Sequence, residues 1–126
     1  MSENYCIAIV DDDEAIRDAL SDLLMVSGFS CIAYDGAATF LADYVVRDFS
    51  CLVTDVRMPG MSGIDLLAHL RDAYTFLPVV VLTSVLDDAT RTRALALGAH
   101  AWLIKPVADD RLLAAIGSAI EAGSVQ

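Results

Sequence analysis

Charged and hydroxyl side chains stand at the ends of four apolar runs of this sequence. Asp11 and Asp12 follow YCIAIV, and Asp55 follows SCLVT. Thr83 ends LPVVVLT, and Lys105 follows AWLI. Carboxylate oxygens are the ligands that Mg²⁺ prefers, and this ion usually takes only a few of them together with water and phosphate. If the runs are neighbouring strands, the five side chains meet in one place and form a cation site with a fixed positive charge beside it.

Folding alone gives no reason for carboxylates at two neighbouring strand ends. Two carboxylates about 5 Å apart repel each other by about 3 kcal/mol at an effective dielectric constant near 20, so a cation should compensate them. Acidic residues after a strand also serve as helix N-caps, and we expect Asp13 to be one. The Asp11–Asp12 pair by itself fits either interpretation. The three further side chains, each at another strand end, favour the site.

The elements that would position these side chains alternate along the chain. Short apolar runs predict buried strands, and segments with apolar residues on one face predict helices. Ser62 and Asp65 have the spacing of a capping box at the start of the third helix. We expect strands at 5–10, 29–34, 50–54, 77–83 and 101–104, and helices at 13–26, 36–46, 62–73, 87–97 and 109–122.

Strands that alternate with helices of this length indicate βαβ units, which have right-handed crossovers and a parallel sheet. Five such units predict an α/β fold with a doubly wound, five-stranded parallel sheet. In sheets of this kind, ligands bind beyond the carboxyl ends of the strands. The acidic, hydroxyl and lysine side chains are all expected there.

Length and composition set further bounds. The 126 residues are 56% hydrophobic, so we expect one domain, 1–126, with one hydrophobic core. The net charge of −10 argues against a nucleic-acid-binding surface, which needs clustered Lys and Arg. The opening MSENYC does not resemble a signal peptide, and no apolar run approaches the ~20 residues that span a bilayer. We therefore expect a cytoplasmic protein that does not enter the membrane.

The cysteines and histidines offer no metal-binding pattern. Cys6, Cys31 and Cys51 are odd in number and far apart, so we expect buried, reduced thiols. His69 in the third helix and His100 in a turn have no partner at ligand spacing. We expect both histidines to be structural.

Four segments resemble the signature motifs of one protein family. They are IVDDD at 9–13, VTDVRMPGMSG at 53–63, VVLTS at 80–84 and WLIKP at 102–106. In order and spacing they are similar to the receiver (CheY-like) domains of two-component response regulators, and closest to FixJ-type regulators. The resemblance extends over nearly the whole chain. It implies a flavodoxin-like sandwich with strand order 2-1-3-4-5, and a phosphorylated signalling domain, not a turnover enzyme.

The resemblance also implies roles for the residues at the strand ends. Asp55 resembles the phosphoacceptor, which takes a phosphoryl group from a sensor histidine kinase or a phosphotransfer protein. Asp12 resembles the carboxylate that binds Mg²⁺ directly, and Asp11 the one that holds it through water. Asp55 and the backbone carbonyl of Arg57 complete the ligand set, and Mn²⁺ or Ca²⁺ would be able to substitute.

Other positions resemble the phosphoryl-binding and switch residues of the family. Thr83 corresponds to the hydroxyl residue that binds a phosphoryl oxygen, and Lys105 to the lysine that pairs with the phosphoryl group. The Lys105–Pro106 bond is expected to be cis. Trp102 stands where the family has a switch aromatic, usually Tyr or Phe, which turns inward when Thr83 moves toward the phosphoryl group. One metal ion, one ammonium and one hydroxyl can surround the three equatorial oxygens of the group in transfer.

Two positions depart from the better-known pattern of the family. Arg57 lies two residues after Asp55, and Val85 lies two residues after Thr83. Side chains there line the path of water to the phosphoryl group, so we hypothesise that both help to set the lifetime of phosphorylated Asp55. The alternative is that both are ordinary surface loop residues.

The family's usual output and dimer surface consists of the fourth helix, the fifth strand and the fifth helix. In this chain it comprises segments 87–97, 101–104 and 109–122, and it would control a partner or output domain or form a homodimer. Its mixed charges also fit an ordinary solvated face. They belong to Arg91, Arg93, Asp109, Asp110 and Arg111.

Three other functions remain open at this point. A degenerate receiver would bind partners without phosphorylation, but it would have no reason to keep a self-repelling acidic cluster. A Mg²⁺-dependent phosphohydrolase usually needs an acid/base carboxylate two residues after the nucleophile, where this chain has Arg57. A flavodoxin-like electron carrier would need a phosphate loop rich in Ser, Thr and Gly after the first strand, which is absent here.

Overall fold

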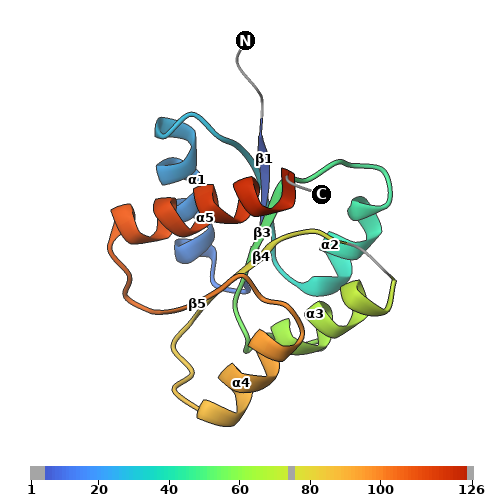
Figure 1. Ribbon diagram of the computed structural model, residues 1–126. Helices are drawn as coiled ribbons and strands as arrows, with labels where there is room; N and C mark the ends of the chain where they lie inside the picture. Colours follow the sequence, from blue (N-terminus) through green and yellow to red (C-terminus); the bar gives the residue numbers. More distant parts are fainter. Residues whose placement is uncertain (1–4, 74–75, 125–126) are drawn as a thin grey trace.

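The computed structural model describes residues 5–73 and 76–124. Within these residues five strands alternate with five helices (Figure 1). The strands are β1 (Cys6–Val10), β2 (Ser30–Tyr34), β3 (Cys51–Thr54), β4 (Val79–Thr83) and β5 (Ala101–Ile104). The helices are α1 (Glu14–Val26), α2 (Ala37–Tyr44), α3 (Gly63–Asp72), α4 (Asp88–Ala96) and α5 (Asp109–Ser124).

The strands form one parallel sheet in the order β2-β1-β3-β4-β5, which confirms the predicted doubly wound α/β fold. Val10, the last residue of β1, pairs with the last residue of β3, Thr54. The next residues, Asp11 and Asp55, therefore leave adjacent strands at the same level. Likewise, the last residues of β4 and β5 pair with each other, so Lys105 leaves the sheet level with the end of β4.

Each face of the sheet carries its own layer of helices and its own hydrophobic cluster. Helices α2, α3 and α4 cover one face, where Phe40 and Leu67 are fully buried. Helices α1 and α5 cover the other face, where Leu24 and Ile116 are buried. Alternate residues of β1 contribute to the two clusters, as the two-residue period of a strand requires. The sheet thus has both faces covered, and chemistry is confined to its ends.

The helix caps follow the sequence closely, whereas several element ends differ by one or two residues. Asp13 caps α1 through the Ala15 N–H, and Ser62 forms the predicted capping box with Asp65. Helix α2 ends at Tyr44, although we expected residues 45 and 46 to continue it. These two valines are 80% and 78% exposed, so no packing holds them in the helix.

The three cysteines are free thiols, but only one is buried as predicted. Cys51 lies on the central strand β3, and burial raises the pKa of its thiol to about 12. Cys6 and Cys31 are only partly buried, because β2 is an edge strand and its neighbour β1 is open at its first residue. His100 forms a 3.0 Å hydrogen bond with Ser118 on α5, which agrees with the structural role that we expected for it.

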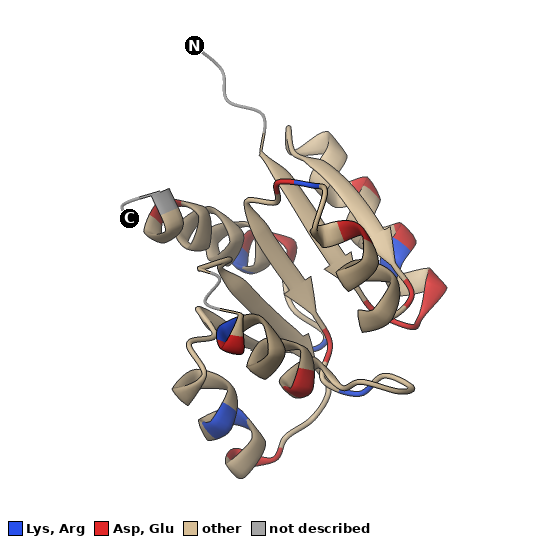
Figure 2. Ribbon diagram, turned by 90° about the vertical axis from the view of Figure 1, so that its right-hand side faces the viewer, with Lys and Arg blue, Asp and Glu red and all other residues tan. Residues whose placement is uncertain are grey.

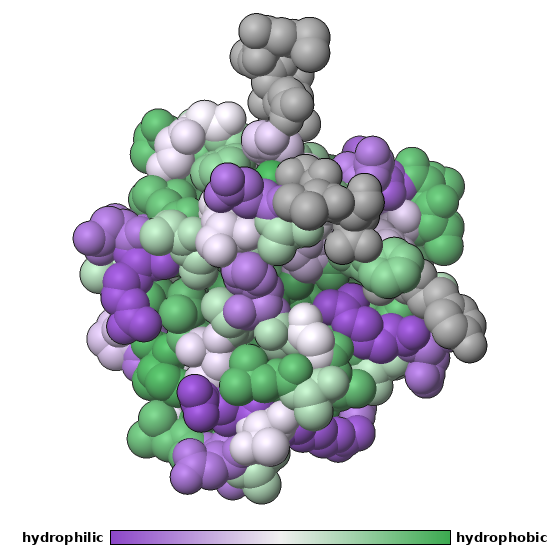
Figure 3. Space-filling view, in the orientation of Figure 1, coloured by the Kyte–Doolittle hydropathy of each residue, from purple (hydrophilic) through white to green (hydrophobic). Residues whose placement is uncertain are grey.

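No helix in the described part of the chain is long and apolar enough to cross a membrane. On the face seen in Figure 3, hydrophobic and hydrophilic side chains are interspersed. This pattern is usual for a water-exposed protein surface.

Candidate functional site

Three of the predicted side chains meet beyond the carboxyl ends of the strands. The Lys105 ammonium lies 2.8 Å from Oδ2 of Asp55 and 3.0 Å from Oδ2 of Asp11. The side chains of Asp11 and Asp55 are only 4% and 12% exposed, and that of Lys105 is 19% exposed. In Figure 2, red and blue ribbon segments meet beyond the arrowheads of the central strands. Lys105 thus supplies the fixed positive charge that we expected beside the carboxylates, while the metal ion that we expected to compensate them stays a prediction.

Asp55 is held as an ionised carboxylate. Its Oδ1 accepts a hydrogen bond from the Val56 N–H at 2.6 Å, and its Oδ2 accepts one from Lys105. Burial would raise the pKa of Asp55, but hydrogen bonds from the Lys105 ammonium and the Thr83 hydroxyl prevail and hold the pKa below its usual value. At neutral pH the group is thus ionised.

Asp11 acts as a buried anchor. Its Oδ1 accepts a hydrogen bond from the Asp13 N–H at 2.9 Å, while its Oδ2 accepts one from Lys105. Its backbone carbonyl accepts a 2.8 Å bond from Arg17, one turn into α1. With both carboxylate oxygens engaged, Asp11 fixes the ammonium next to Asp55.

Lys105 is positioned by the strand that precedes it. Its backbone N–H donates to the Thr83 carbonyl at 2.9 Å, and its bond to Pro106 is cis, as predicted. Burial would lower the pKa of Lys105, but the hydrogen bonds to Asp55 and Asp11 and their charges raise it. The lysine therefore stays charged at physiological pH.

Asp12 lies apart from the lysine, beside the loop that follows Asp55. It lines an open cavity of about 450 Å³ together with Arg57 and neighbouring residues of that loop. Its carboxylate is exposed and has no hydrogen-bond partner among residues 5–73 and 76–124. Asp12 and Arg57 thus line the same cavity, and their binding of a metal ion stays a prediction.

The donor set suits Mg²⁺ by its chemistry, although it is not arranged as a closed cage. Three carboxylates and one peptide carbonyl provide only hard oxygen ligands, and Mg²⁺ usually keeps several waters. Among the described residues, no three His, Cys, Asp or Glu side chains are grouped so that they could hold a metal ion by themselves. The reason is that Asp11 and Asp55 are turned toward Lys105, while Asp12 faces the open cavity.

Thr83 is fully buried at the end of β4. Its Oγ1 accepts a hydrogen bond from the Val85 N–H at 3.2 Å, and the hydroxyl contributes to the lowered pKa of Asp55. Val85 is only 9% exposed and belongs to the hydrophobic cluster beneath α3, whereas Arg57 is exposed. Val85 is thus not a surface loop residue, and the effect of both residues on phosphoryl lifetime stays a prediction.

Trp102 on β5 is partly buried and packs against the cluster on the α3 and α4 face. It lines a cavity of about 300 Å³ with Leu86, Ile104 and residues at the start of α4. Its ring therefore lies where a shift of α4 would change its surroundings, and its role as a switch remains a prediction.

Sequence reasoning missed two residues that shape the site. Gly63 opens α3, and a Cβ there would lie 2.0 Å from the Asp55 carbonyl oxygen, so only glycine fits. Its N–H also donates to the Val56 carbonyl at 2.8 Å. The sequence feature that could have indicated this close approach is the glycine directly after the capping Ser62. The second residue is Arg17, which donates a hydrogen bond to the Asp11 carbonyl. It lies four residues after the Asp13 cap, and this spacing was the only signal in the sequence.

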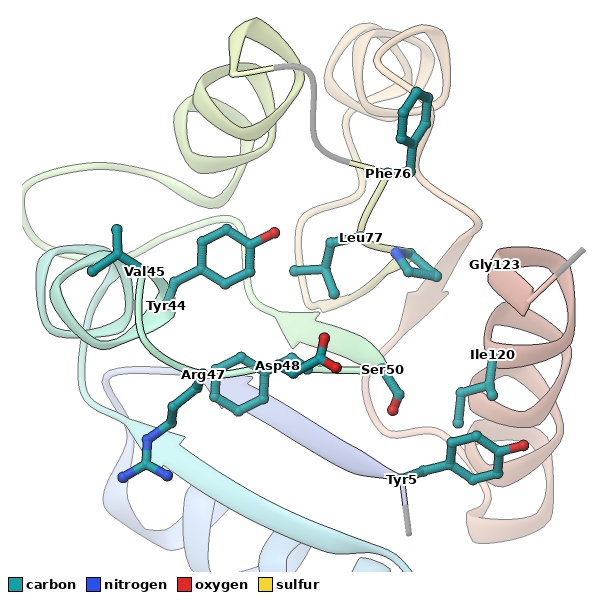
Figure 4. A pocket seen from close by; sticks show the side chains of 12 residues that line it. Tyr5, Tyr44, Val45, Arg47, Asp48, Ser50, Phe76, Leu77, Ile120 and Gly123 are labelled. Atoms are coloured by element: carbon teal, nitrogen blue, oxygen red, sulfur yellow. The ribbon is translucent and has the colours of Figure 1, made fainter. Parts of the chain in front are cut away.

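A larger cavity, about 600 Å³, lies at the opposite end of the sheet (Figure 4). Tyrosine, phenylalanine and aliphatic side chains from several elements surround it, with Asp48 and Arg47 at its edge. None of the five side chains singled out in the sequence lines it. The candidate chemistry is therefore at the carboxyl end of the strands.

Comparison with known proteins agrees with this geometry. The profile of the response regulator receiver domain matches residues 7–117. Transcriptional regulatory protein FixJ of Bradyrhizobium diazoefficiens is 42% identical over 114 residues, which cover 90% of this chain and 56% of FixJ. Response regulator protein TodT of Pseudomonas putida is 35% identical over 115 residues, which cover 91% of this chain and 51% of TodT. The chain thus spans about half the length of these relatives.

Solved structures show the same similarity. Full-length FixJ from B. japonicum has a TM-score of 0.90 at 39% identity, covering 97% of this chain and 60% of that one. The chemotaxis response regulator CheY4 of Vibrio cholerae has a TM-score of 0.84 at 27% identity, covering 93% and 99% of the two chains. With its fold, its strand-end residues and these relatives in agreement, the chain belongs to the response regulator receiver domain family of two-component systems.

Proposed function

We propose that this receiver domain accepts a phosphoryl group on Asp55 from a sensor histidine kinase or a phosphotransfer protein. The observation that carries the proposal is the 2.8 Å contact between the Lys105 ammonium and Asp55. The ammonium keeps the nucleophile ionised and lies where the charge of an incoming phosphoryl group must be neutralised.

In the proposed step, an Asp55 carboxylate oxygen attacks the phosphorus of a phosphohistidine in line with the P–N bond. An O–P bond forms, the P–N bond breaks, and the imidazole of the partner leaves with the electron pair. Lys105 and the Thr83 hydroxyl would bind oxygens of the transferred group, because the ammonium already contacts the Asp55 carboxylate and the hydroxyl lies close enough to lower its pKa.

We further propose that Mg²⁺ is the cofactor and that Mn²⁺ or Ca²⁺ can replace it. Asp12 would bind it directly, Asp11 through water, and Asp55 and the Arg57 carbonyl would complete the ligand set. When bound, the ion supplies positive charge for the phosphoryl oxygens. The Asp12 carboxylate is exposed beside the Arg57 loop and has no partner within the described ranges, which supports this assignment.

Phosphorylation would act on the surface of α4, β5 and α5 through Thr83 and Trp102. That surface would control a partner or output domain, or pair with a second copy of the chain. The names of the relatives, a transcriptional regulatory protein and a response regulator protein, support an output of this kind. We propose that the domain acts in the cytoplasm.

Intact mass after incubation with acetyl phosphate and Mg²⁺ tests the proposal. We expect one phosphoryl adduct in the native chain and in Asp35→Asn, a control that removes an exposed carboxylate after β2. We expect none in Asp55→Asn and none when the metal is chelated. A native chain without adduct would indicate a degenerate receiver, and repeated turnover of phosphomonoesters would indicate a phosphohydrolase.

A further inference from the structure

Helix α4 is attached to the rest of the protein mainly at its C-terminal end. Ala94 is its only buried side chain among the described residues, and all the side chains of its first two turns are exposed or partly exposed. Just after the helix, Leu97 packs against the hydrophobic cluster and Ala99 is buried. In Figure 1, α4 lies at the lower edge of the molecule. Its N-terminal half therefore has few contacts that could hold it.

Arg71 on α3 binds the C-terminal end of α4. Its Nε donates to the Leu97 carbonyl at 2.9 Å, and one terminal nitrogen donates to the Gly98 carbonyl at 3.2 Å. The other terminal nitrogen donates to the Leu77 carbonyl at 3.1 Å, just before β4. A Cβ on Gly98 would lie 3.2 Å from the Arg71 Nε, so the guanidinium lies directly against this turn. Carbonyls at a helix C-terminus carry partial negative charge, which a guanidinium complements.

The segment before α4 is tied to the end of β4 through the Thr83 hydroxyl, which lies beside Asp55. Its Oγ1 accepts a hydrogen bond from the Val85 N–H, and the hydroxyl is close enough to Asp55 to lower the pKa of that carboxyl. After Val85, Leu86 is 77% exposed, and Asp87 then caps the helix. If the hydroxyl moved toward a group on Asp55, the Val85 bond would lengthen and the start of α4 would lose its tie to β4.

We propose that Arg71 is the pivot about which α4 moves: when the Thr83 hydroxyl turns away from Val85, the N-terminal half of the helix is released while Arg71 keeps its C-terminal end fixed. Phosphorylation as the natural trigger rests on the proposed function of Asp55. The pivot itself rests only on the contacts of Arg71 and on the unequal packing of α4. Arg71 is thus a positioning residue, since it lies outside the acceptor site.

Hydrogen–deuterium exchange of segments 85–91 and 94–99 tests the pivot without phosphorylation. Thr83→Val removes the hydroxyl at nearly constant volume. We expect exchange in 85–91 to rise about fivefold, the factor that corresponds to one hydrogen bond of typical net strength, with 94–99 unchanged. In the double variant Thr83→Val/Arg71→Met, the rise should extend to 94–99.

Two further variants separate the hydrogen bonds of Arg71 from its charge and its effect on folding. Arg93→Met, combined with Thr83→Val, removes an exposed positive charge from the last turn of α4 and should leave 94–99 protected. Arg71→Lys keeps the charge but lacks the planar guanidinium whose three nitrogens reach three separate carbonyls, so it should give an intermediate rise. If thermal melting shows that the Arg71→Met variant does not fold, Arg71→Lys takes its place in the experiment.

The pivot is contradicted if 94–99 is protected equally with and without Arg71, or if Thr83→Val alone opens 94–99. The native chain treated with acetyl phosphate and Mg²⁺ should reproduce the Thr83→Val pattern. If no phosphoryl adduct forms, the proposed function of Asp55 fails, and the variants still decide on the pivot. If an adduct forms and 94–99 opens together with 85–91, the pivot fails and the acceptor role stands.

Discussion

Asp11 and Asp55 leave adjacent strands at the same level, and both turn toward the ammonium of Lys105. This arrangement places two nearly buried negative charges next to one positive charge, so these three side chains together carry one net negative charge. A divalent ion or a phosphoryl group changes that balance at once, because charges interact strongly where water is partly excluded. The lysine thus connects folding stability to ligand binding.

Replacement of Lys105 by Met should lower the free energy of unfolding at pH 7 by about 2 kcal/mol, because two poorly hydrated carboxylates lose their partner. The pKa of Asp55 should rise, since the lysine is a principal cause of its lowering. Urea unfolding measures the first effect, and NMR titration of the carboxyl carbon measures the second.

Arg111→Met removes an exposed positive charge on α5 and serves as the control, for which we expect almost no change. Addition of Mg²⁺ should recover more stability in the Lys105 variant than in the native chain. Equal stability of Lys105→Met and native chain without metal would show that the ammonium does not compensate the carboxylates.

Gly63 is required by the close approach of α3 to the backbone that follows β3. In Gly63→Ala, the added Cβ would overlap the Asp55 carbonyl, so the backbone of the acceptor must shift. We expect a loss of about 2 kcal/mol in the free energy of unfolding and slower phosphorylation by acetyl phosphate. Gly117→Ala on α5 is the matched control, since nothing lies within 4 Å of its added Cβ. If both variants behave alike, the close approach has no energetic consequence.

Among the elements, β2 and α2 are joined by one side-chain network. The Tyr34 hydroxyl donates to Asp43 at 2.5 Å, and Arg47 donates to the same oxygen at 2.6 Å. The Tyr34 ring packs edge-on against Phe40 and Phe49, with centroids 5.6 and 6.2 Å away. Because β2 is an edge strand, this network is a main connection between that edge and the helix layer.

Burial, followed by the hydrogen bond to Asp43, raises the pKa of Tyr34 from 10 to about 12. The folded state thus prefers the neutral phenol, so the contribution of Tyr34 to stability is complete below pH 10 and is lost as the pH rises from 10 to about 12. Titration of phenolate absorbance should show one tyrosine that ionises near pH 12 and is missing in Tyr34→Phe. In Asp43→Asn that pKa should fall. Ionisation of every tyrosine near pH 10 would disprove the network.

The sequence predicted most elements and their caps because these depend on neighbours in the chain. Ser62 and Asp65 form their capping box within one helical turn, and β5 has the predicted bounds. The meeting of Asp11, Asp55 and Lys105 was predicted because the carboxyl ends of parallel strands converge, whereas Asp12 lies apart from the lysine. Contacts between distant segments could not be predicted from neighbouring residues. The hydrogen bonds of Arg71 join residues that are 26 and 27 positions apart, and the one between Lys105 and Asp11 joins residues 94 positions apart.

The burial of Cys6 and Cys31 was overestimated, because the order of the strands in the sheet decides which of them lie at an edge.

The whole molecule consists of two hydrophobic clusters that share one sheet. Leu67 on α3 and Ile116 on α5 are both fully buried, but they belong to opposite faces. The strands between them contribute alternate side chains to each cluster, so loss of one cluster exposes the backbone that supports the other. The two layers should therefore unfold together, even though their side chains do not mix.

Leu67→Ala and Ile116→Val test this coupling. Truncation of a fully buried side chain leaves a cavity, so we expect losses of about 3 and about 1 kcal/mol in the free energy of unfolding. Because the sites lie on opposite faces, the losses should add to within about 0.5 kcal/mol in the double variant. Urea unfolding followed by Trp102 fluorescence and by far-ultraviolet circular dichroism should give one coincident transition in every variant. Separate transitions by the two probes in either single variant would show that the α1–α5 layer and the α2–α4 layer are independent, because the shared sheet would then not transmit the loss of one cluster to the other.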